Sequence, residues 1–156
     1  EKKENLTNTF NTLLEMGIIP VVNENDSVSY TEIESEERLF GDNDRLSAVV
    51  AVLCGAGKLV ILSDIDGLYD ADPRLYPHAK RIERIEKIDG SVYALAGGAG
   101  SRRGTGGMRT KLQAAELAAS QGIETVITNG RHPEALYEII RGNPVGTLFA
   151  GKKEPV

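Results

Sequence analysis

Hydrophobic positions along the chain recur in two patterns, one typical of helices and one typical of buried strands. Four apolar residues near the start share one helical face: Leu6, Phe10, Leu13 and Leu14. They predict an amphipathic helix, which we expect to stop at Gly17. Three short, nearly continuous apolar runs predict buried strands: residues 18–23, 58–63 and 123–129. Pro20 weakens the first of these predictions, because proline cannot donate a hydrogen bond to a neighbouring strand.

Three further segments, which lie between or after these strands, carry helix signals: residues 41–57, 108–121 and 132–142. Asp42 or Asp44 is expected to cap the first of them, and Gly55 or Gly57 to end it. Weaker signals predict a half-exposed strand within 81–89, a short helix followed by a glycine-rich loop within 90–107, and a closing edge strand at 146–149. Helices that alternate with buried strands are typical of βαβ units. We therefore predict an α/β fold, a three-layer αβα sandwich with a mainly parallel sheet.

In an open parallel sheet the ligand lies at the carboxyl ends of the strands, so the residues just after each predicted strand are candidates for a site. These segments read Asn-Glu-Asn-Asp at 23–26, Ser-Asp-Ile-Asp-Gly at 63–67 and Asn-Gly-Arg-His-Pro at 129–133. The first two are rich in carboxylates, and Asp64 is the first charged group beyond its strand. Acidic residues are also common in plain turns, so the pattern by itself allows either interpretation.

A glycine-rich stretch, Gly-Thr-Gly-Gly-Met-Arg-Thr-Lys at 104–111, runs directly into the helix predicted at 108–121. Glycines expose backbone N–H groups and a helix start adds partial positive charge, so the combination is typical of an anion site, most often for phosphate. Lys111 lies early in the helix, where it is able to reach such a phosphate. A flexible surface loop with a solvated Lys111 is the alternative. The stretch is not a P-loop, because its lysine does not directly follow a glycine.

Two short runs of aspartate and asparagine, at 23–26 and 41–44, flank a predicted loop or hairpin. Folding back of the chain there would bring Asp26, Asn43 and Asp44 into one region. Such side chains are able to bind a ligand with both amino and carboxylate groups, or a metal ion through oxygen ligands. Turn formation is the alternative, because aspartate and asparagine are preferred turn residues.

Composition and charge exclude some classes of function. The 156 residues are 40% hydrophobic and 26% charged, which is enough for one domain with a hydrophobic core. The net charge of −5 argues against broad binding to nucleic acids or anionic membranes. The single cysteine, Cys54, lies in an apolar run and is expected to be buried. The polar start lacks the pattern of a signal peptide and no apolar run is long enough to cross a bilayer, so we expect a cytoplasmic protein.

Five motifs, taken in order, resemble the amino acid kinase family, in the branch that phosphorylates glutamate. They are PVVNEND, FGDNDRLSAVVA, ILSDIDGLYDADPR, GTGGMRTKLQAAELA and GNPVGTLF, and the resemblance spans Asn5 to Phe149. The glycine motif is shared with acetylglutamate and related kinases, but its combination with the two acidic runs is highly specific. The resemblance implies transfer of the ATP γ-phosphate to the side-chain carboxylate of L-glutamate, the first step of proline biosynthesis. The alternatives are a family member that acts on acetylglutamate or aspartate, and a non-catalytic nucleotide- or amino-acid-binding module.

The resemblance also implies roles for individual residues. Lys111 is expected to stabilise the transferring phosphoryl group, and Asp44 to organise the catalytic lysines. Asp26 and Asn43 are expected to bind glutamate. ATP is expected to contact two segments, which comprise Ser63, Asp64, Thr105, Gly106, Gly107, Met108, Arg109, Thr110 and Lys111. Mg²⁺ is expected to arrive with the nucleotide, with no protein ligand assigned to it.

The resemblance covers only part of a kinase domain. Residues 1–149 match its C-terminal portion, and residues 150–156 are interpreted as a tail or linker. A phosphate loop with a second lysine is expected upstream, within about 100 residues that precede this portion in the family. The chain alone is therefore expected to be inactive. We also expect a homo-oligomer that does not bind nucleic acid through this segment, and proline is a candidate feedback inhibitor.

Overall fold

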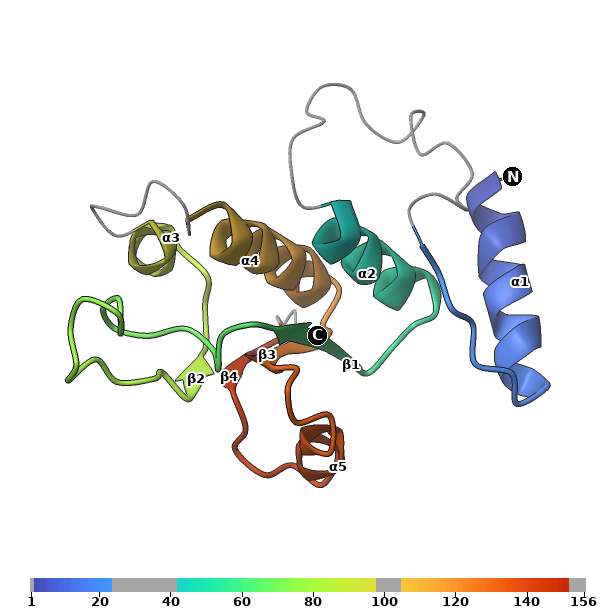
Figure 1. Ribbon diagram of the computed structural model, residues 1–156. Helices are drawn as coiled ribbons and strands as arrows, with labels where there is room; N and C mark the ends of the chain where they lie inside the picture. The colour runs from blue at the N-terminus through green and yellow to red at the C-terminus, as the bar shows by residue number, and fades with distance from the viewer. Residues whose placement is uncertain (1, 24–41, 98–104, 152–156) are drawn as a thin grey trace.

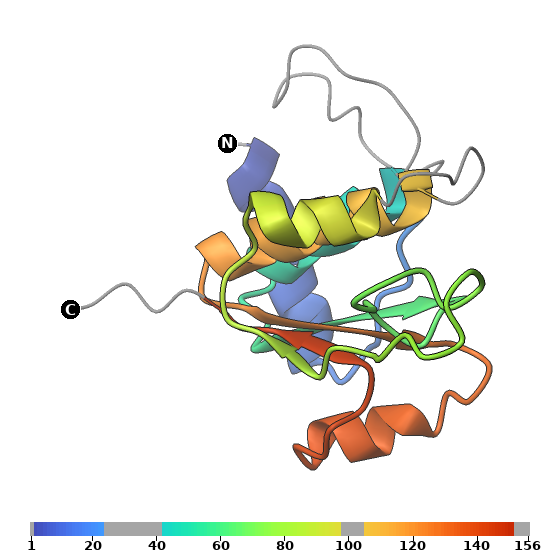
Figure 2. The same cartoon turned by 90° about the vertical axis from the view of Figure 1, so that its left-hand side faces the viewer.

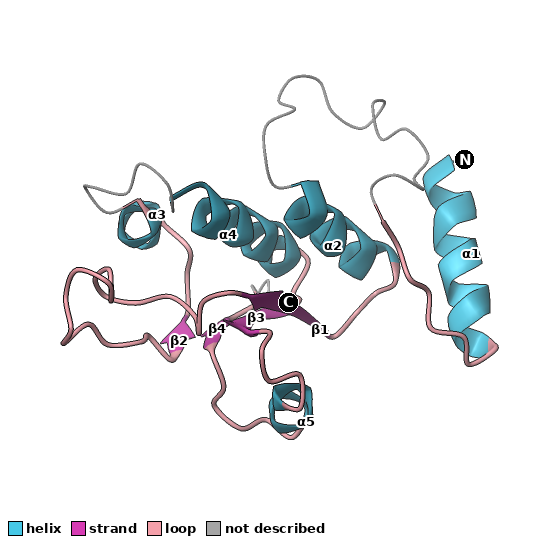
Figure 3. Ribbon diagram, viewed as in Figure 1, coloured by secondary structure: helices cyan, strands magenta, loops and turns pink. Residues whose placement is uncertain are grey.

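A computed structural model of the chain describes residues 2–23, 42–97 and 105–151. This part of the chain contains five helices: α1 (Lys2–Glu15), α2 (Asp42–Leu53), α3 (Gly90–Ala96), α4 (Thr105–Ser120) and α5 (Ala135–Ile140). It contains four strands: β1 (Lys58–Ser63), β2 (Arg84–Ile85), β3 (Glu124–Asn129) and β4 (Thr147–Phe149). Figure 1 and Figure 3 show the helices grouped around a single sheet. The predicted α/β fold is therefore confirmed.

The four strands form one sheet in the order β1-β3-β4-β2. β1 and β3 are parallel, β4 and β2 are parallel, and β3 and β4 are antiparallel. The prediction of a closing edge strand at 146–149 is wrong, because β4 lies between β3 and β2. The two-residue strand β2 takes the outer position, where the backbone N–H of Leu148 donates to the carbonyl of Glu83 at 2.9 Å.

Helices cover both faces of the sheet, which confirms the predicted three layers (Figure 2). α2, α3 and α4 lie on one face, and α5 lies on the other. α4 is the middle helix of the larger layer, and four small buried residues let it pack closely: Ala114, Ala115, Ala118 and Ala119. The core around it contains Leu112, Ile61, Ile127 and Phe149. This packing holds the start of α4 in a defined position relative to the sheet.

The predicted strand at residues 18–23 is absent from the structure, so that prediction is wrong. The segment follows α1 without regular secondary structure, and Ile19 and Val21 are 85% and 94% exposed. Among the described residues, no strand pairs with the outer edge of β1, whose Leu62 is 44% exposed. An apolar run becomes a strand only when another strand supplies its hydrogen bonds, and no strand within 2–23, 42–97 or 105–151 does so for this run. β3, in contrast, has neighbours on both sides and is buried on both faces, as predicted.

The helix boundaries differ from the sequence pattern in a way that matters for the candidate site. α2 starts at Asp42, so Asp44 lies inside its first turn, and the Asp44 side chain contacts α4 instead of capping its own helix. α4 starts at Thr105, three residues before the predicted start, which places two glycines of the motif inside its first turn. Gly55 follows α2 with a φ of 60°, a left-handed conformation that favours glycine, and this confirms the predicted helix end.

The strand and the short helix that the weaker patterns predict are also found in the structure, but they are shorter than the predicted ranges. β2 lies within 81–89, and α3 lies within 90–107. α3 begins after Asp89, whose carboxylate accepts hydrogen bonds from the backbone N–H groups of Ser91 and Val92. The Ser91 hydroxyl also donates to this carboxylate. The bond from the hydroxyl, followed by the two backbone bonds, lowers the pKa of Asp89. α5 is limited to six residues of the segment predicted at 132–142.

Candidate functional site

The carboxyl ends of β1 and β3 lie side by side and carry a cluster of polar residues. Ser63 and Asn129, the last residues of the two strands, are paired in register. The backbone N–H of Gly130 donates to the carbonyl of Ser63 at 2.8 Å. The Asn129 amide donates to the carboxylate of Asp66 at 2.9 Å. We call Ser63, Asp64, Asp66 and Asn129 the strand-end cluster.

Helix direction brings two more segments to the same end of the sheet. α2 leads into β1 and α4 leads into β3 through short turns, so each helix runs opposite to the strand that follows it. The starts of α2 and α4 therefore lie over the carboxyl ends of β1 and β3, and Figure 2 shows both starts on the side toward which β1 points. Helix starts carry unpaired backbone N–H groups and partial positive charge, which favour anions.

Asp44 and Lys111 form an ion pair between these two helix starts. The Nζ of Lys111 lies 3.1 Å from Oδ2 and 3.4 Å from Oδ1 of Asp44. Both side chains are largely buried, at 16% and 17% exposure, so solvent screens their attraction less than it would at the surface. We call Asp44 and Lys111 the helix-start pair. It ties the first turn of α2 to the second turn of α4.

Thr110 adds a second link between the same two helices. Its hydroxyl lies 2.7 Å from Oδ2 of Asp44 and 2.9 Å from the carbonyl of Gly107, and its single proton donates to one of these acceptors at a time. The Asp44 carbonyl, in turn, accepts a hydrogen bond from the Ser47 hydroxyl at 2.6 Å. Asp44 is thus held by its backbone while its carboxylate orients both Thr110 and Lys111.

Arg109 belongs to the segment expected to contact ATP, but its guanidinium faces α3. Its Cζ lies 5.5 Å from the centre of the Tyr93 ring, within range of a cation–π interaction. The Tyr93 hydroxyl donates to the carboxylate of Glu116 at 2.8 Å. Burial, followed by this hydrogen bond, raises the pKa of Tyr93 to about 12. α4 is therefore held by α2 on one side and by Tyr93 of α3 on the other.

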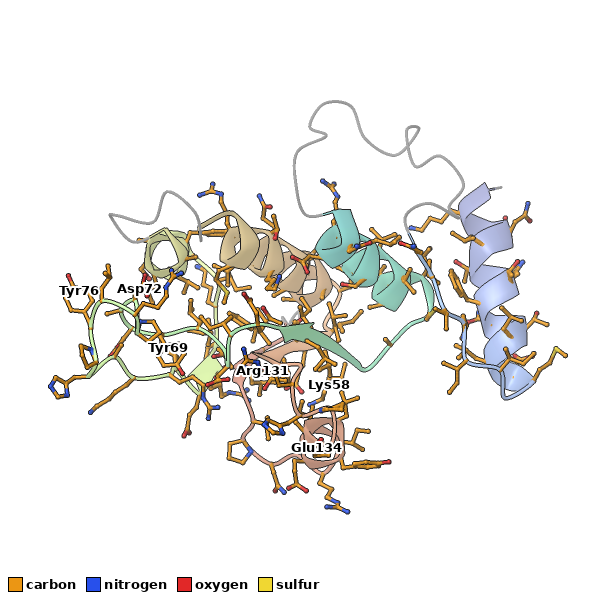
Figure 4. All side chains as sticks on the ribbon, in the orientation of Figure 1. Lys58, Tyr69, Asp72, Tyr76, Arg131 and Glu134 are labelled. Carbon is orange, nitrogen blue, oxygen red and sulfur yellow. The ribbon has the colours of Figure 1, made fainter. Side chains whose placement is uncertain are left out.

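The turn after β1 carries the other residues expected to contact ATP. The Ser63 hydroxyl donates to the carboxylate of Asp64 at 3.1 Å, and the Asp64 side chain is exposed. Tyr69 and Arg131, labelled in Figure 4, belong to the segments that follow β1 and β3. The Tyr69 hydroxyl lies 3.5 Å from Asp66, and the backbone N–H of Arg131 donates to Oδ1 of Asn129 at 2.9 Å. These bonds lie within each strand-end segment, and the bond from Asn129 to Asp66 links the two segments.

The structure brings some of the sequence-predicted residues together and leaves others unplaced. It places Lys111, Thr110 and Asp44 in direct contact. It places Asn43 in the first turn of α2 with an exposed side chain. Asp26 lies outside the described residues, and for Thr105 and Gly106 only the helical backbone is described. Met108 is half-buried against the core, so its side chain has a packing role in this structure.

Two residues of the site region were not singled out by the sequence. Asn129 lies in one of the three segments that follow a predicted strand, so the sequence predicted its place near the site. The sequence did not predict its contact with Asp66. Tyr93 carried no signal, because its partners Arg109 and Glu116 are distant in sequence.

Other features of the described residues bear on the remaining expectations. No group of three or more His, Cys, Asp or Glu side chains in the described ranges is arranged to hold a metal ion. None of the helices that the structure describes combines the length and apolarity that a membrane span requires. Cys54 is partly rather than fully buried, and this burial raises the pKa of its thiol.

Known proteins that resemble this chain share its sequence over almost all of its length. The chain is 53% identical over 151 residues to a glutamate 5-kinase of Clostridium perfringens, covering 97% of this chain and 56% of that protein. It is 52% identical over 151 residues to a glutamate 5-kinase of Idiomarina loihiensis, covering 97% of this chain and 39% of that protein. The chain thus spans about half the length, or less, of these curated relatives.

A solved structure and a family profile agree with this likeness. The uridylate kinase of Archaeoglobus fulgidus matches 69% of this chain and 46% of its own, with a TM-score of 0.50 and 22% sequence identity, which indicates a common fold. The profile of the amino acid kinase family matches residues 1–129. By this match over most of its length, the chain belongs to the amino acid kinase family.

Proposed function

We propose that this chain forms part of a glutamate 5-kinase, which transfers the γ-phosphate of ATP to the side-chain carboxylate of L-glutamate. The observation that carries the proposal is the helix-start pair, which holds a lysine at the end of the sheet where ligands bind in folds of this kind. The identity of about half to glutamate 5-kinases over 97% of the chain supports this substrate. It favours glutamate over acetylglutamate or aspartate.

The reaction does not require the protein to supply a general base. A free glutamate side chain has a pKa of about 4.3, so the attacking carboxylate is already ionised at neutral pH. One of its oxygens forms a bond to the γ-phosphorus while the bond from that phosphorus to the β,γ-bridging oxygen breaks. The products are glutamyl 5-phosphate and ADP. Positioning and positive charge around the transferring group therefore supply most of the catalysis.

Lys111 is the cation that we assign to the transferring phosphoryl group. In the structure Asp44 holds its ammonium group between the two helix starts, which limits the number of positions that it samples. The first two turns of α4, from Thr105 to Lys111, and the pair Ser63 and Asp64 are proposed to contact ATP. Mg²⁺ is proposed to enter as the complex of the nucleotide, because this ion is usually bound by phosphates, waters and one or two carboxylates. Asp26 and Asn43 are proposed to bind glutamate.

The rest of the catalytic machinery is proposed to come from outside these residues. Residues 1–149 would form the C-terminal portion of a kinase domain, with a preceding portion that carries a phosphate loop and a second lysine, and residues 150–156 a tail or linker. On this basis the 156-residue chain alone does not phosphorylate glutamate. We further propose a cytoplasmic homo-oligomer that proline inhibits. The length of the curated relatives supports the division of the domain.

The proposal is tested in the complete protein that contains this chain, supplied with ATP and Mg²⁺. Acyl phosphate is trapped with hydroxylamine, and L-glutamate, N-acetylglutamate and L-aspartate are compared as acceptors. We expect product with glutamate and little with the other two. A preference for either of the others assigns the chain to another branch of the family, and ATP binding without any acyl phosphate supports a non-catalytic module.

A Lys111→Ala variant tests the catalytic role within the same assay. We expect kcat to fall by about 10²-fold or more while ATP still binds, as is typical when one charge-stabilising group is removed. Lys58→Ala is the matched control, because Lys58 lies at the opposite end of β1 and pairs with Glu124 at the surface (Figure 4). Unchanged turnover in Lys111→Ala would refute the role of this lysine.

A further inference from the structure

Asn129, at the end of β3, is not among the residues expected to act in catalysis or binding, yet it joins the two strand-end segments. We propose that Asn129 is a positioning residue that holds the turn at 63–66 in the conformation that binds ATP. This inference rests on the proposed function, because Ser63 and Asp64 of that turn are the residues that we expect to contact the nucleotide. The side chain acts through its hydrogen bonds within the protein.

The two bonds of the Asn129 amide determine its orientation. Its Oδ1 accepts from the backbone N–H of Arg131 at 2.9 Å, and its Nδ2 donates to Oδ1 of Asp66 at 2.9 Å. A flipped amide would place its NH₂ group against the N–H of Arg131 and its oxygen against a carboxylate, so both bonds would be lost. The amide is therefore matched to its partners in only one orientation. It connects the turn after β1 to the turn after β3.

The Asn129 bond lies at a point where the chain after β1 has few other restraints. At one end of the turn, the carbonyl of Ser63 accepts from Gly130 at 2.8 Å. At the other end, the backbone N–H of Leu68 donates to the hydroxyl of Thr147 at 2.8 Å. Between these two points, Asp66 is exposed, and Asn129 is its stronger partner, because the Tyr69 hydroxyl is at 3.5 Å. Asn129 thus holds Asp66 between two points, Ser63 and Leu68, that other residues hold.

This arrangement predicts a specific kinetic effect. Without the Asn129 bond the turn samples more conformations, and the apparent affinity for ATP falls in proportion to the fraction that remains competent to bind. Affinity for glutamate is unaffected, because its expected binding residues, Asp26 and Asn43, lie on other segments. A residue with a general structural role would instead lower stability and affect both substrates.

The test compares variants of the complete protein that contains this chain, with KM for ATP, KM for glutamate and direct ATP binding measured for each. Asn129→Ala removes both bonds, but only the bond to Asp66 holds the turn after β1. We therefore expect it to raise the KM for ATP about fivefold, which corresponds to one hydrogen bond of ordinary strength. Asn129→Asp should raise it more, because it places a second carboxylate beside Asp66. Combining Asn129→Asp with Asp66→Asn restores a carboxylate–amide pair with the partners exchanged, so we expect the KM for ATP to recover.

Asn143→Asp is the matched control. Asn143 also donates its amide to a carboxylate, that of Glu138, but it follows α5 and lies outside the strand-end cluster. It is expected to leave both KM values unchanged. An unchanged KM for ATP in Asn129→Asp, an equal rise in the KM for glutamate, or the same effect in Asn143→Asp would overturn the positioning role. Wild-type protein that binds ATP but does not phosphorylate glutamate would refute the proposed function instead, and the binding measurements would still decide the role of Asn129.

Discussion

Thr147 and Thr125 allow the same substitution, threonine to valine, to be tested at two fully buried positions with opposite expected effects. The Thr147 hydroxyl accepts from the backbone N–H of Leu68 at 2.8 Å and lies 2.6 Å from the carbonyl of Ile82, to which it donates. The Thr125 hydroxyl is buried and has no hydrogen-bond partner among the described residues. Valine has nearly the shape of threonine, so each substitution removes a hydroxyl and leaves the packing in place.

At Thr147 the substitution leaves two backbone groups without their partner: the N–H of buried Leu68 and the carbonyl of half-buried Ile82. Leu68 is almost fully buried, so its N–H cannot turn to solvent. A buried donor left unpaired costs about 1–3 kcal/mol, and the added methyl group returns part of this cost, so we expect a loss of about 2 kcal/mol. For a chain of this length such a loss lowers Tm by about 4–8 °C.

At Thr125 the same change removes a hydroxyl that is desolvated without compensation. We expect Thr125→Val to be neutral or more stable by about 1 kcal/mol, because an apolar group then occupies an apolar site. The two variants should therefore differ by about 2–3 kcal/mol in the free energy of unfolding. The 156-residue chain is unfolded in urea and followed by far-ultraviolet circular dichroism, which gives this free energy for each variant.

The comparison has a clear point of failure. Equal losses in both variants would mean that methyl-for-hydroxyl packing, rather than hydrogen bonding, decides the result. Stability of Thr147→Val within about 0.5 kcal/mol of the wild type would show that the link from β4 to residues 68 and 82 contributes nothing measurable.

Two further predictions concern a glycine and a tyrosine. Gly146 has a φ of 67°, and a Cβ there would lie 2.2 Å from the carbonyl oxygen of Ile127, so Gly146→Ala should lose about 3 kcal/mol or more in a urea titration. Gly57→Ala meets no atom within 4 Å and should stay close to wild type, so a similar loss there would contradict the steric argument. Tyr93 should ionise near pH 12 in an ultraviolet titration, later than an ordinary tyrosine, and Tyr93→Phe should remove that step. Because the pKa of Tyr93 is raised above the ordinary value of 10.0, its contribution to stability is complete below about pH 10 and is lost as the pH rises toward 12. Ionisation of Tyr93 at the pH of an ordinary tyrosine would refute the contact with Glu116.

Local sequence patterns determined the helices and strands whose apolar residues follow a helical or strand-like spacing. The alanine-rich helix α4, the apolar strand β3 and the helix α2 were all predictable. In each of them, the spacing of apolar residues along the segment itself indicates which positions are buried. The same patterns placed polar residues after β1 and β3, and βαβ logic brought those residues to one end of the sheet. Motif resemblance added the expected roles of Lys111 and Asp44.

Tertiary structure decided which strands pair and which side chains meet. Residues 18–23 are as apolar as β1, but no strand lies beside them in the part of the chain that the structure describes. The weakly predicted β2, in contrast, is a strand because β4 supplies its hydrogen bonds. Thr110 and Lys111 reach Asp44, and Asn129 reaches Asp66, across more than 60 positions of sequence. A periodic pattern records which face of a segment is buried, but it contains no information about the distant partner that buries it. That partner is determined only by the packing of the whole domain.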